Sequence, residues 1–298
     1  MVDRKYRAAT RLEPDTSNPV TSTRSFGGVA RNVAENLARL NVSTALVSIV
    51  GDDENGRELR KDLGRIGIAT DHIALSAGKP TAEYVAVLQP DGSLAFGLAD
   101  MAILDSFGSD RLDAAWSALS KAAWVFADCN LPAPVLEALI ERARSAAFKL
   151  AVDAVSRAKA KRLPAMLCGI DLLFLNETEA QAYLGASEQS GRAASLLRER
   201  GAAAVLLTRG AEGVIVSQES GDVVVPALAT TIADVTGAGD AFIAGTLSKL
   251  LAGADLVDAA RVGSAAAALT AGSQASVRPD LSRELLRAAM AEPLASPR

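Results

Sequence analysis

The chain has 298 residues, 49% of them apolar, which suits one large folded domain and excludes disorder over most of its length. Its 31 basic and 35 acidic residues give a net charge of −4, which excludes a broad positive surface for nucleic acid. No apolar run approaches the roughly 20 residues of a membrane span, and the amino-terminal stretch lacks the apolar core of a secretory signal. We therefore expect a cytoplasmic protein that acts on a small molecule, with no nucleic-acid or membrane partner.

Cysteine and histidine are scarce. Cys129 and Cys168 lie far apart and form neither a metal-binding spacing nor a disulfide framework. Histidine occurs once, at His72. A Ser-His-Asp triad and a histidine-rich metal site are therefore disfavoured.

Helical and strand patterns alternate in the first quarter of the chain. Apolar residues recur at helical spacing in 27–40, the run STALVSIVG (43–51) predicts a buried strand, and 54–67 predicts an amphipathic helix that ends at Gly67. The pattern changes at 81–99, where two β-rich runs flank Pro90-Asp91-Gly92. We expect a hairpin there, in a small sheet that projects from the main body.

The alternation resumes at residue 122. It predicts strands at 122–128, 149–155, 171–176 and 203–210, a hairpin at 213–227, and helices at 133–146, between 155 and 171, after 176, at 191–201 and over most of 240–290. Repeated strand–helix alternation is typical of a doubly wound, mostly parallel sheet with helices on both faces. The expected fold class is α/β, in a single domain.

The stretch DVTGAGDAFIAG (234–245) carries the strongest functional signal. Gly237, Ala238 and Gly239 precede a helix that we expect to begin near Asp240, so their backbone N–H groups can converge on an anion. Asp240 would accept the proton of an attacking hydroxyl in phosphoryl transfer. The alternative is a glycine-rich turn capped by Asp240, which the dense pattern D-x-T-G-A-G-D disfavours.

Two weaker patterns follow predicted strands. In NETE, Asn176 and Glu179 suit an Mg²⁺ site held through water, although a plain helix start explains them equally well. Thr208 and Gly210 end another strand, and they suit either a nucleotide-phosphate turn or an ordinary turn before a hairpin.

A third weak pattern opens the first predicted helix. Gly28 would let a ligand approach the backbone and Asn32 could bind a sugar hydroxyl, although a simple loop-to-helix junction explains both. The chain has neither G-x-x-x-x-G-K-[ST] nor G-x-G-x-x-G after a strand. A P-loop kinase and a Rossmann dehydrogenase are therefore disfavoured.

These motifs together resemble a known family. DVTGAGDAFIAG is similar to the carboxy-terminal signature of ribokinase-like, PfkB-type carbohydrate kinases, and GGVARNVAENLARL (27–40) to their amino-terminal glycine motif. NETE resembles their N-x-x-E magnesium motif and TRGAEG (208–213) their nucleotide turn. The likeness covers nearly the whole chain in the family's order. Within the family, further stretches of the chain resemble pseudouridine kinases, at 2–8, 16–19, 98–105, 127–132 and 153–163.

The resemblance implies a fold and a set of catalytic groups. The fold would be a ribokinase-like doubly wound domain of residues 1–298, with a small β lid formed by segments about 5–25 and 78–105. Asp240 would be the base, and the amides of Gly237, Ala238 and Gly239 would form the anion hole.

It also implies how the ligands are held. Asn176 and Glu179 would position Mg²⁺–ATP through water, and Thr208 and Gly210 would lie beside the nucleotide. The substrate residues implied are Asp3, Gly28 and Asn32 around the ribose, with Asn18 and Asp100 approaching the nucleoside from the lid.

The expected protein is an ATP- and Mg²⁺-dependent kinase that phosphorylates the 5′-hydroxyl of a ribosyl substrate. Pseudouridine is the substrate that we expect first. The alternative substrates are ribose, another nucleoside or a sugar acid. The alternative to an enzyme is a catalytically inactive nucleoside-binding protein. The resemblance further implies a homodimer through the lid, and it leaves a monovalent-cation requirement open.

The chain also departs from the family pattern. The family has a complete strand before the residue that matches Asp3, whereas only Met1 and Val2 precede it here, so we expect unpaired backbone groups in the central sheet. Asp15 stands where the pattern has glycine, and Phe26 where it has proline.

Overall fold

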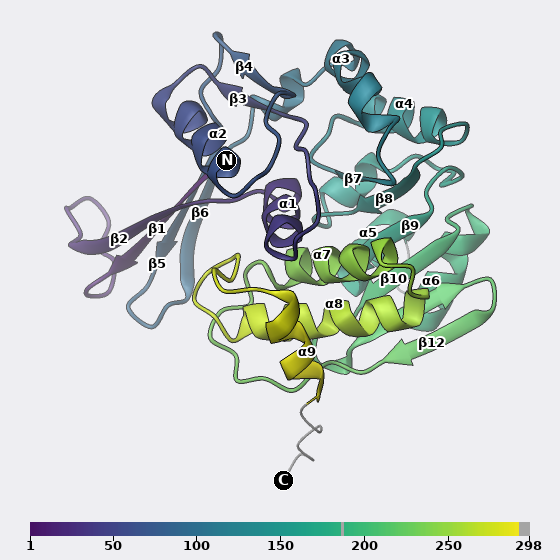
Figure 1. Ribbon diagram of the computed structural model, residues 1–298. Helices are drawn as coiled ribbons and strands as arrows, with labels where there is room; N and C mark the ends of the chain where they lie inside the picture. Colours follow the sequence, from purple (N-terminus) through teal and green to yellow (C-terminus); the bar gives the residue numbers. More distant parts are fainter. Residues whose placement is uncertain (186–187, 292–298) are drawn as a thin grey trace.

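The computed structural model describes residues 1–185 and 188–291, and its centre is a six-stranded sheet (Figure 1). The strand order is β12-β11-β10-β9-β8-β7, in which β7 to β10 are parallel and β11 and β12 are antiparallel additions. The bounds are β7 Trp124–Asp128, β8 Lys149–Asp153, β9 Leu172–Asn176, β10 Ala204–Thr208, β11 Val214–Gln218 and β12 Gly221–Val225. The sheet is therefore the mostly parallel one that the sequence predicts.

Helices cover both faces of this sheet. One face packs against α1 (Val29–Arg39), α7 (Ala238–Leu251) and α8 (Leu256–Ala271), and the other against α3 (Ser109–Leu119), α4 (Ala133–Ala143), α5 (Glu177–Leu184) and α6 (Ser190–Glu199). In β9, Leu173 packs in the cluster with α4 and α6, whereas Phe174 packs edge-on against Phe242 of α7. Burial on both faces explains why these strands are continuous apolar runs.

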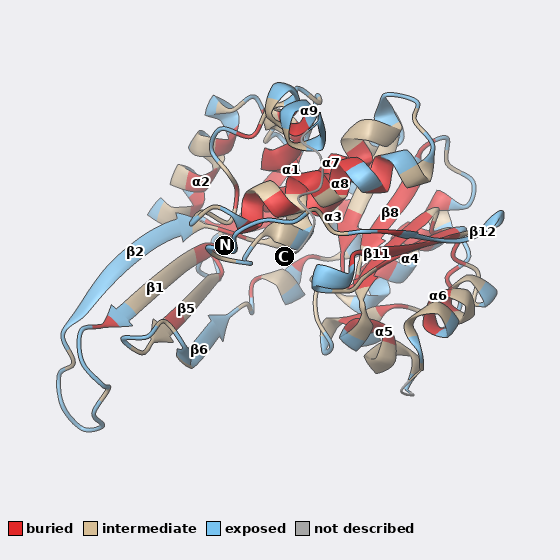
Figure 2. Cartoon of the chain, turned by 90° about the horizontal axis from the view of Figure 1, so that it is seen from below, coloured by how far each residue is buried: buried red, intermediate tan, exposed pale blue. Residues whose placement is uncertain are grey.

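A second, four-stranded sheet projects from this body (Figure 1). Its order is β2-β1-β5-β6, with β1 Val2–Ala8, β2 Val20–Phe26, β5 Glu83–Leu88 and β6 Leu94–Asp100. The strand β1 pairs antiparallel with β2 and parallel with β5. Figure 2 shows β2 and β6 largely exposed, in contrast to the buried strands of the main sheet.

A parallel pair, β3 (Ser48–Gly51) and β4 (Ile73–Ser76), lies beside α2 (Glu54–Arg65) and is not hydrogen-bonded to either sheet among the described strands. A cavity of about 290 Å³ is lined both by Ser48 and Ile49 of β3 and by Val125 and Phe126 of β7. Each of β3 and β7 has a strand neighbour on one side only.

The helix α9 (Arg283–Ala291) packs against α8. Among residues 1–185 and 188–291, no helix has both the length and the apolar character to cross a bilayer.

Three predictions of secondary structure need correction. The helix expected between 155 and 171 is only a 3₁₀ turn, Lys159–Arg162, because Pro164 cannot donate to a helix and the chain beyond it packs into the core irregularly. The strand expected from residue 43 is regular only from Ser48. The helix expected near Asp240 begins at Ala238.

Candidate active site

The site is built around the start of α7, which lies at the carboxyl ends of the parallel strands. Gly237 is the residue before the helix and has φ 82°, a left-handed value that glycine adopts without strain. A Cβ there would overlap the Ser276 carbonyl oxygen, so only glycine fits this approach of the two segments. Asp240 lies in the first turn of the helix and is half-buried.

The three small residues before Asp240 do not contribute equally to an anion cradle. The Ala238 N–H donates to the Val235 carbonyl oxygen at 3.2 Å, whereas no hydrogen bond from the Gly237 or Gly239 N–H exists among the described residues. Free N–H groups at a helix start attract an anion. The expected cradle of three amides therefore has two that are available, those of Gly237 and Gly239.

Asn32 is the direct partner of Asp240. Its side-chain Nδ2 donates to Asp240 Oδ2 at 2.7 Å, which joins α1 to α7. Gly28, with φ 110°, precedes α1, and its carbonyl oxygen accepts from the Asn32 N–H at 2.8 Å. The structure thus brings Gly28, Asn32 and Asp240 together, but Asn32 contacts the acid rather than standing free for a sugar.

The electrostatic surroundings of Asp240 shift its acidity. Burial raises the pKa of Asp240 to about 7, opposed by the hydrogen bond from Asn32. The nearby carboxylates of Asp128 and Asp3 also raise this pKa, and the Arg31 guanidinium lowers it. A carboxyl group with a pKa near neutrality is suited to proton transfer at physiological pH.

Asp3 is the second acid of the site. Its Oδ1 is buried and has no hydrogen-bond partner among the described residues, and burial raises the pKa of this carboxyl. A Cβ at Gly27 would overlap Asp3 Oδ2, so the glycine makes room for the carboxylate. Because a buried acceptor without a partner is costly, Asp3 Oδ1 is a natural acceptor for a ligand hydroxyl.

Asp128 also belongs to the site, although the sequence reasoning did not single it out. It ends β7 and is buried, and its two carboxylate oxygens accept from the backbone N–H of Ala30 and of Asn130. It therefore anchors the first turn of α1, which carries Asn32. The sequence signal that could have identified Asp128 was a carboxylate at the end of a predicted buried strand of a parallel sheet.

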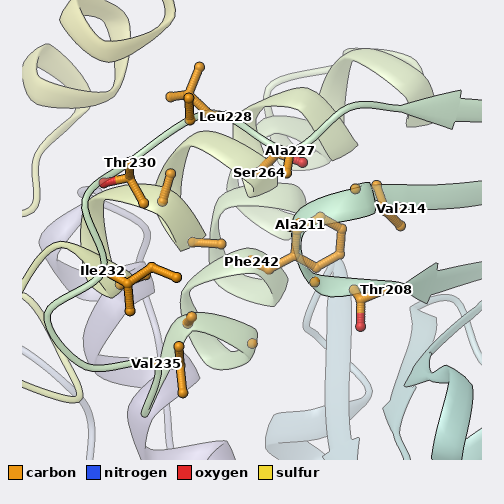
Figure 3. Close-up of a pocket in the computed structure, with 18 residues that line it drawn as sticks. Thr208, Ala211, Val214, Ala227, Leu228, Thr230, Ile232, Val235, Phe242 and Ser264 are labelled. Atoms are coloured by element: carbon orange, nitrogen blue, oxygen red, sulfur yellow. The ribbon is translucent and has the colours of Figure 1, made fainter. Parts of the chain in front are cut away.

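An apolar cleft of about 540 Å³ lies beside the cradle (Figure 3). Thr208 and Gly210 line it from the turn after β10, and Gly239 and Phe242 from α7. The sequence reasoning missed the rest of its wall, which includes Leu228, Ile232, Val235, Ser264 and Ala268. Ile232 and Val235 are 66% and 65% exposed, so they offer apolar surface to a ligand in this cleft.

A second, polar cleft of about 940 Å³ lies on the other side of the segment 232–235. Lys5, Thr23 and Ser25 of the projecting sheet line it on one side, and Arg31 of α1 on the other. Lys5 Nζ donates to Asp234 Oδ2 at 3.0 Å and so ties the sheet to the glycine-rich segment. The two clefts thus share the segment that leads into the cradle.

Asn176 and Glu179 form the capping box of α5. Asn176 Oδ1 accepts from the Glu179 N–H at 3.0 Å, and Glu179 Oε2 accepts from the Asn176 N–H at 2.9 Å. Burial raises the pKa of Glu179, opposed by these bonds. The plain helix-start interpretation therefore holds, and Glu179 Oε1 remains as an acceptor. No cluster of three metal-ligating side chains occurs within 1–185 and 188–291.

Two predicted substrate residues are not brought to this site. The Asn18 amide bonds to Glu13 and Thr16 within the loop between β1 and β2. Asp100 of β6 pairs with Glu83 of β5, and Glu83 pairs with Val2 of β1. Because paired residues share a face of the sheet and neighbours along a strand alternate, Asp100 lies on the opposite face from Asp3. The loop's own hydrogen bonds and the pleat of the sheet explain these placements, and a role for Asn18 and Asp100 from the lid stays a prediction.

Comparisons with known proteins all find similarity to sugar and nucleoside kinases. Residues 1–282 match the family model described as pfkB family carbohydrate kinase. An uncharacterised sugar kinase of Escherichia coli K12, YeiI, is 30% identical over 95% of this chain and 79% of its own. The pseudouridine kinase of the same organism is 29% identical over 89% of this chain and 86% of its own. A solved carbohydrate kinase from Agrobacterium tumefaciens is 34% identical, with a TM-score of 0.87 over 97% of this chain and 94% of that one.

Proposed function

The chain belongs to the PfkB family of carbohydrate kinases, phosphotransferases that act on a sugar hydroxyl, and on this premise we propose that it phosphorylates the 5′-hydroxyl of a ribosyl substrate, with pseudouridine as the first candidate. Similarity to the pseudouridine kinase of E. coli over most of both chains supports this choice of substrate.

The observation that carries the proposal is the position of Asp240. It lies one residue after the free amide of Gly239, and the segment 232–235, which borders both clefts, leads into this turn. ATP would place its base in the apolar cleft and its γ-phosphoryl group at the amides of Gly237 and Gly239. Asp240 would then accept the proton of the attacking hydroxyl, while the amides stabilise the charge on the phosphoryl group.

Magnesium would be held through water near α5. Glu179 Oε1 is the oxygen left over from the capping box, and carboxylate oxygen is a ligand that Mg²⁺ and its waters prefer. The ion would neutralise charge on the nucleotide phosphates. The role of the chain is to hold the carboxylate rigidly, which the Asn176 bonds achieve.

The projecting sheet would act as a lid over the acceptor. Its inner face carries Asp3, Lys5 and Arg7 in alternation along β1, next to Thr23 and Ser25 of β2. These polar groups suit a sugar with several hydroxyls. Closure would exclude water and protect ATP from hydrolysis.

The outer face of this sheet would form a homodimer interface. Val20, Phe96 and Leu98 are 41%, 62% and 60% exposed, and the strand register groups Phe96 and Leu98 with Val87 and Val85. An exposed apolar sheet face of this kind is typical of an interaction surface.

The proposal is tested by following ADP release with ATP, Mg²⁺ and a panel of pseudouridine, uridine, ribose and fructose. We expect turnover on pseudouridine to exceed that on the other three. The Asp240→Asn variant should lose about 10³-fold in kcat and keep ATP binding, measured by calorimetry.

Two outcomes would overturn the proposal. Saturable nucleoside binding without ADP release from any acceptor would indicate a binding protein. A normal kcat in Asp240→Asn would remove Asp240 from the role of base, whichever acceptor is used.

A further inference from the structure

We propose that Arg31 is a positioning residue for phosphoryl transfer, because it fixes the Asn32 amide in the one orientation that donates a hydrogen bond to Asp240. This inference rests on the proposed role of Asp240 as the base.

The contacts form a continuous chain along α1. Arg31 Nη1 donates to Asn32 Oδ1 at 2.7 Å, and Asn32 Nδ2 donates to Asp240 Oδ2 at 2.7 Å. The other end of the guanidinium is bound by Glu35, which is itself bound by Arg39 Nη2 at 2.6 Å. Arg31 Nη1 also donates to the Phe26 carbonyl oxygen at 2.6 Å, so the guanidinium is held on several sides.

Hydrogen-bond chemistry makes this arrangement directional. A guanidinium has donors and no acceptor, so the atom of Asn32 that faces Arg31 must be the carbonyl oxygen. The amide nitrogen then faces Asp240, where it stabilises the ionised carboxylate that accepts a proton. With Arg31 removed, the Asn32 amide is free to rotate by half a turn and present its oxygen to Asp240, which disfavours the ionised acid.

Burial of Asn32 and Glu35 strengthens the effect of Arg31 on Asp240. Asn32 and Glu35 are each 6% exposed, so water does not easily replace the lost partner. The other charged groups around Asp240 are Asp3 on β1, Asp128 at the end of β7 and Asp153 at the end of β8, and all three are acidic. Arg31 on α1 is the cation that opposes them, since it lowers the pKa of Asp240.

The test compares Arg31→Met with Arg31→Lys and with a control, Arg57→Met. Methionine keeps the length of the side chain and has no donor, lysine restores one donor, and Arg57 pairs with Asp52 on the exposed surface of α2 at 2.7 Å. Two readouts are taken for each variant: the pH profile of kcat, and the pKa of Asp240 followed by carbon NMR on aspartate labelled at its carboxyl carbon. The NMR readout does not depend on turnover.

We expect Arg31→Met to move the acidic limb of the kcat profile and the NMR pKa of Asp240 to higher pH. At about pH 6 the loss in kcat should be roughly tenfold, which corresponds to a shift of about one pH unit, while the KM for ATP stays unchanged. Arg31→Lys should recover most of the loss, and Arg57→Met should match the wild type.

The inference is overturned if Arg31→Met leaves the Asp240 pKa where it is in the wild type. This result is separable from failure of the proposed function. If Asp240→Asn keeps its kcat, the base assignment fails, whereas the NMR titration still decides whether Arg31 acts on Asp240. If Arg31→Met does not fold, Arg31→Lys decides, since lysine cannot make all the contacts of Arg31 with Phe26, Asn32 and Glu35, which predicts a smaller shift of the Asp240 pKa in the same direction.

Discussion

At the scale of single residues, the site depends on acids that the fold keeps out of water. Asp240, Asp128 and Asp3 have pKa values raised by burial, and each is held by a different element. Asp128 accepts hydrogen bonds from two backbone N–H groups, whereas Asp3 Oδ1 has no partner in the part of the chain that the structure describes. This difference separates a structural acid from one that is available to a ligand.

The raised pKa of Asp240 predicts the pH dependence of turnover. A base works when deprotonated, so kcat should be highest above the pKa of about 7 and fall as pH drops through it. Between about pH 8 and about pH 6 the fall should be about tenfold. Steady-state kcat at saturating ATP and acceptor measures it. A profile that is flat down to about pH 5 would mean that Asp240 keeps the acidity of an exposed aspartate.

Gly27 predicts a selective defect in acceptor binding. Alanine at this position places a methyl group against Asp3 Oδ2, so Gly27→Ala should displace the carboxylate and raise the KM for the acceptor at least several-fold. The KM for ATP should not change, because the apolar cleft is lined by other segments. Initial rates with each substrate varied in turn provide the measurement.

Gly64→Ala is the matched control for Gly27→Ala, because Gly64 lies within α2 and a Cβ there meets no atom within 4 Å. It should leave both KM values unchanged. Equal KM values for the acceptor in Gly27→Ala and the wild type would exclude Asp3 from substrate binding.

At the scale of elements, the capping box of α5 can be separated from a role in magnesium binding. Asn176→Ala removes the cap and should cost about 1 kcal/mol, which lowers Tm by about 2 °C. Asn176→Ser keeps a good capping oxygen and should keep Tm near the wild-type value. Thermal melting measures this difference.

The same two variants report on the metal. If Asn176 also helps to hold Mg²⁺ through water, both should need more Mg²⁺ for half-maximal kcat, because serine does not supply the amide. A normal Mg²⁺ requirement in Asn176→Ser would restrict Asn176 to capping.

The sequence predicted the main sheet well because its strands are buried on both faces. Runs such as Leu172–Asn176 are continuous and apolar, and no alternative period competes with them. The projecting sheet was harder to predict, since β1 and β2 carry polar residues on both faces and show no alternation. The helix α3 was not predicted either, and only Leu112 and Ala115 of its residues are buried.

At the site, too, the sequence predicted what a local motif carries and not what distant segments bring together. Asp240, Gly237 and Gly239 follow from a dense local motif, whereas the placement of Arg31 and Asp128 depends on contacts between distant segments. Asp15 shows what a departure from a motif means physically: it has φ 59°, a value that glycine adopts more easily, at a position where the family pattern has glycine. The placements of Asn18 and Asp100 depend on hydrogen bonds within a loop and on strand pairing, which a short stretch of sequence does not reveal.

At the scale of the whole molecule, the polar cleft lies where the body meets the projecting sheet, next to the apolar cleft in the body. Lys5 of the sheet bonds to Asp234 of the glycine-rich segment, which belongs to the body. Both clefts are bounded by the segment 232–235. If the sheet closes as the proposed lid, its movement would act directly on the loop that would hold the phosphoryl group.

The outer face of that sheet provides the last prediction. If Phe96 and Leu98 are covered by a second copy of the chain, Phe96→Asp buries a charge in an apolar interface and should halve the molecular mass measured by light scattering. Val224→Asp is the control, since Val224 is 58% exposed on β12, in the other sheet. It should keep the mass of the wild type. A wild type that is already monomeric at micromolar concentration would contradict the dimer, and an unchanged mass in Phe96→Asp would move the interface to another surface.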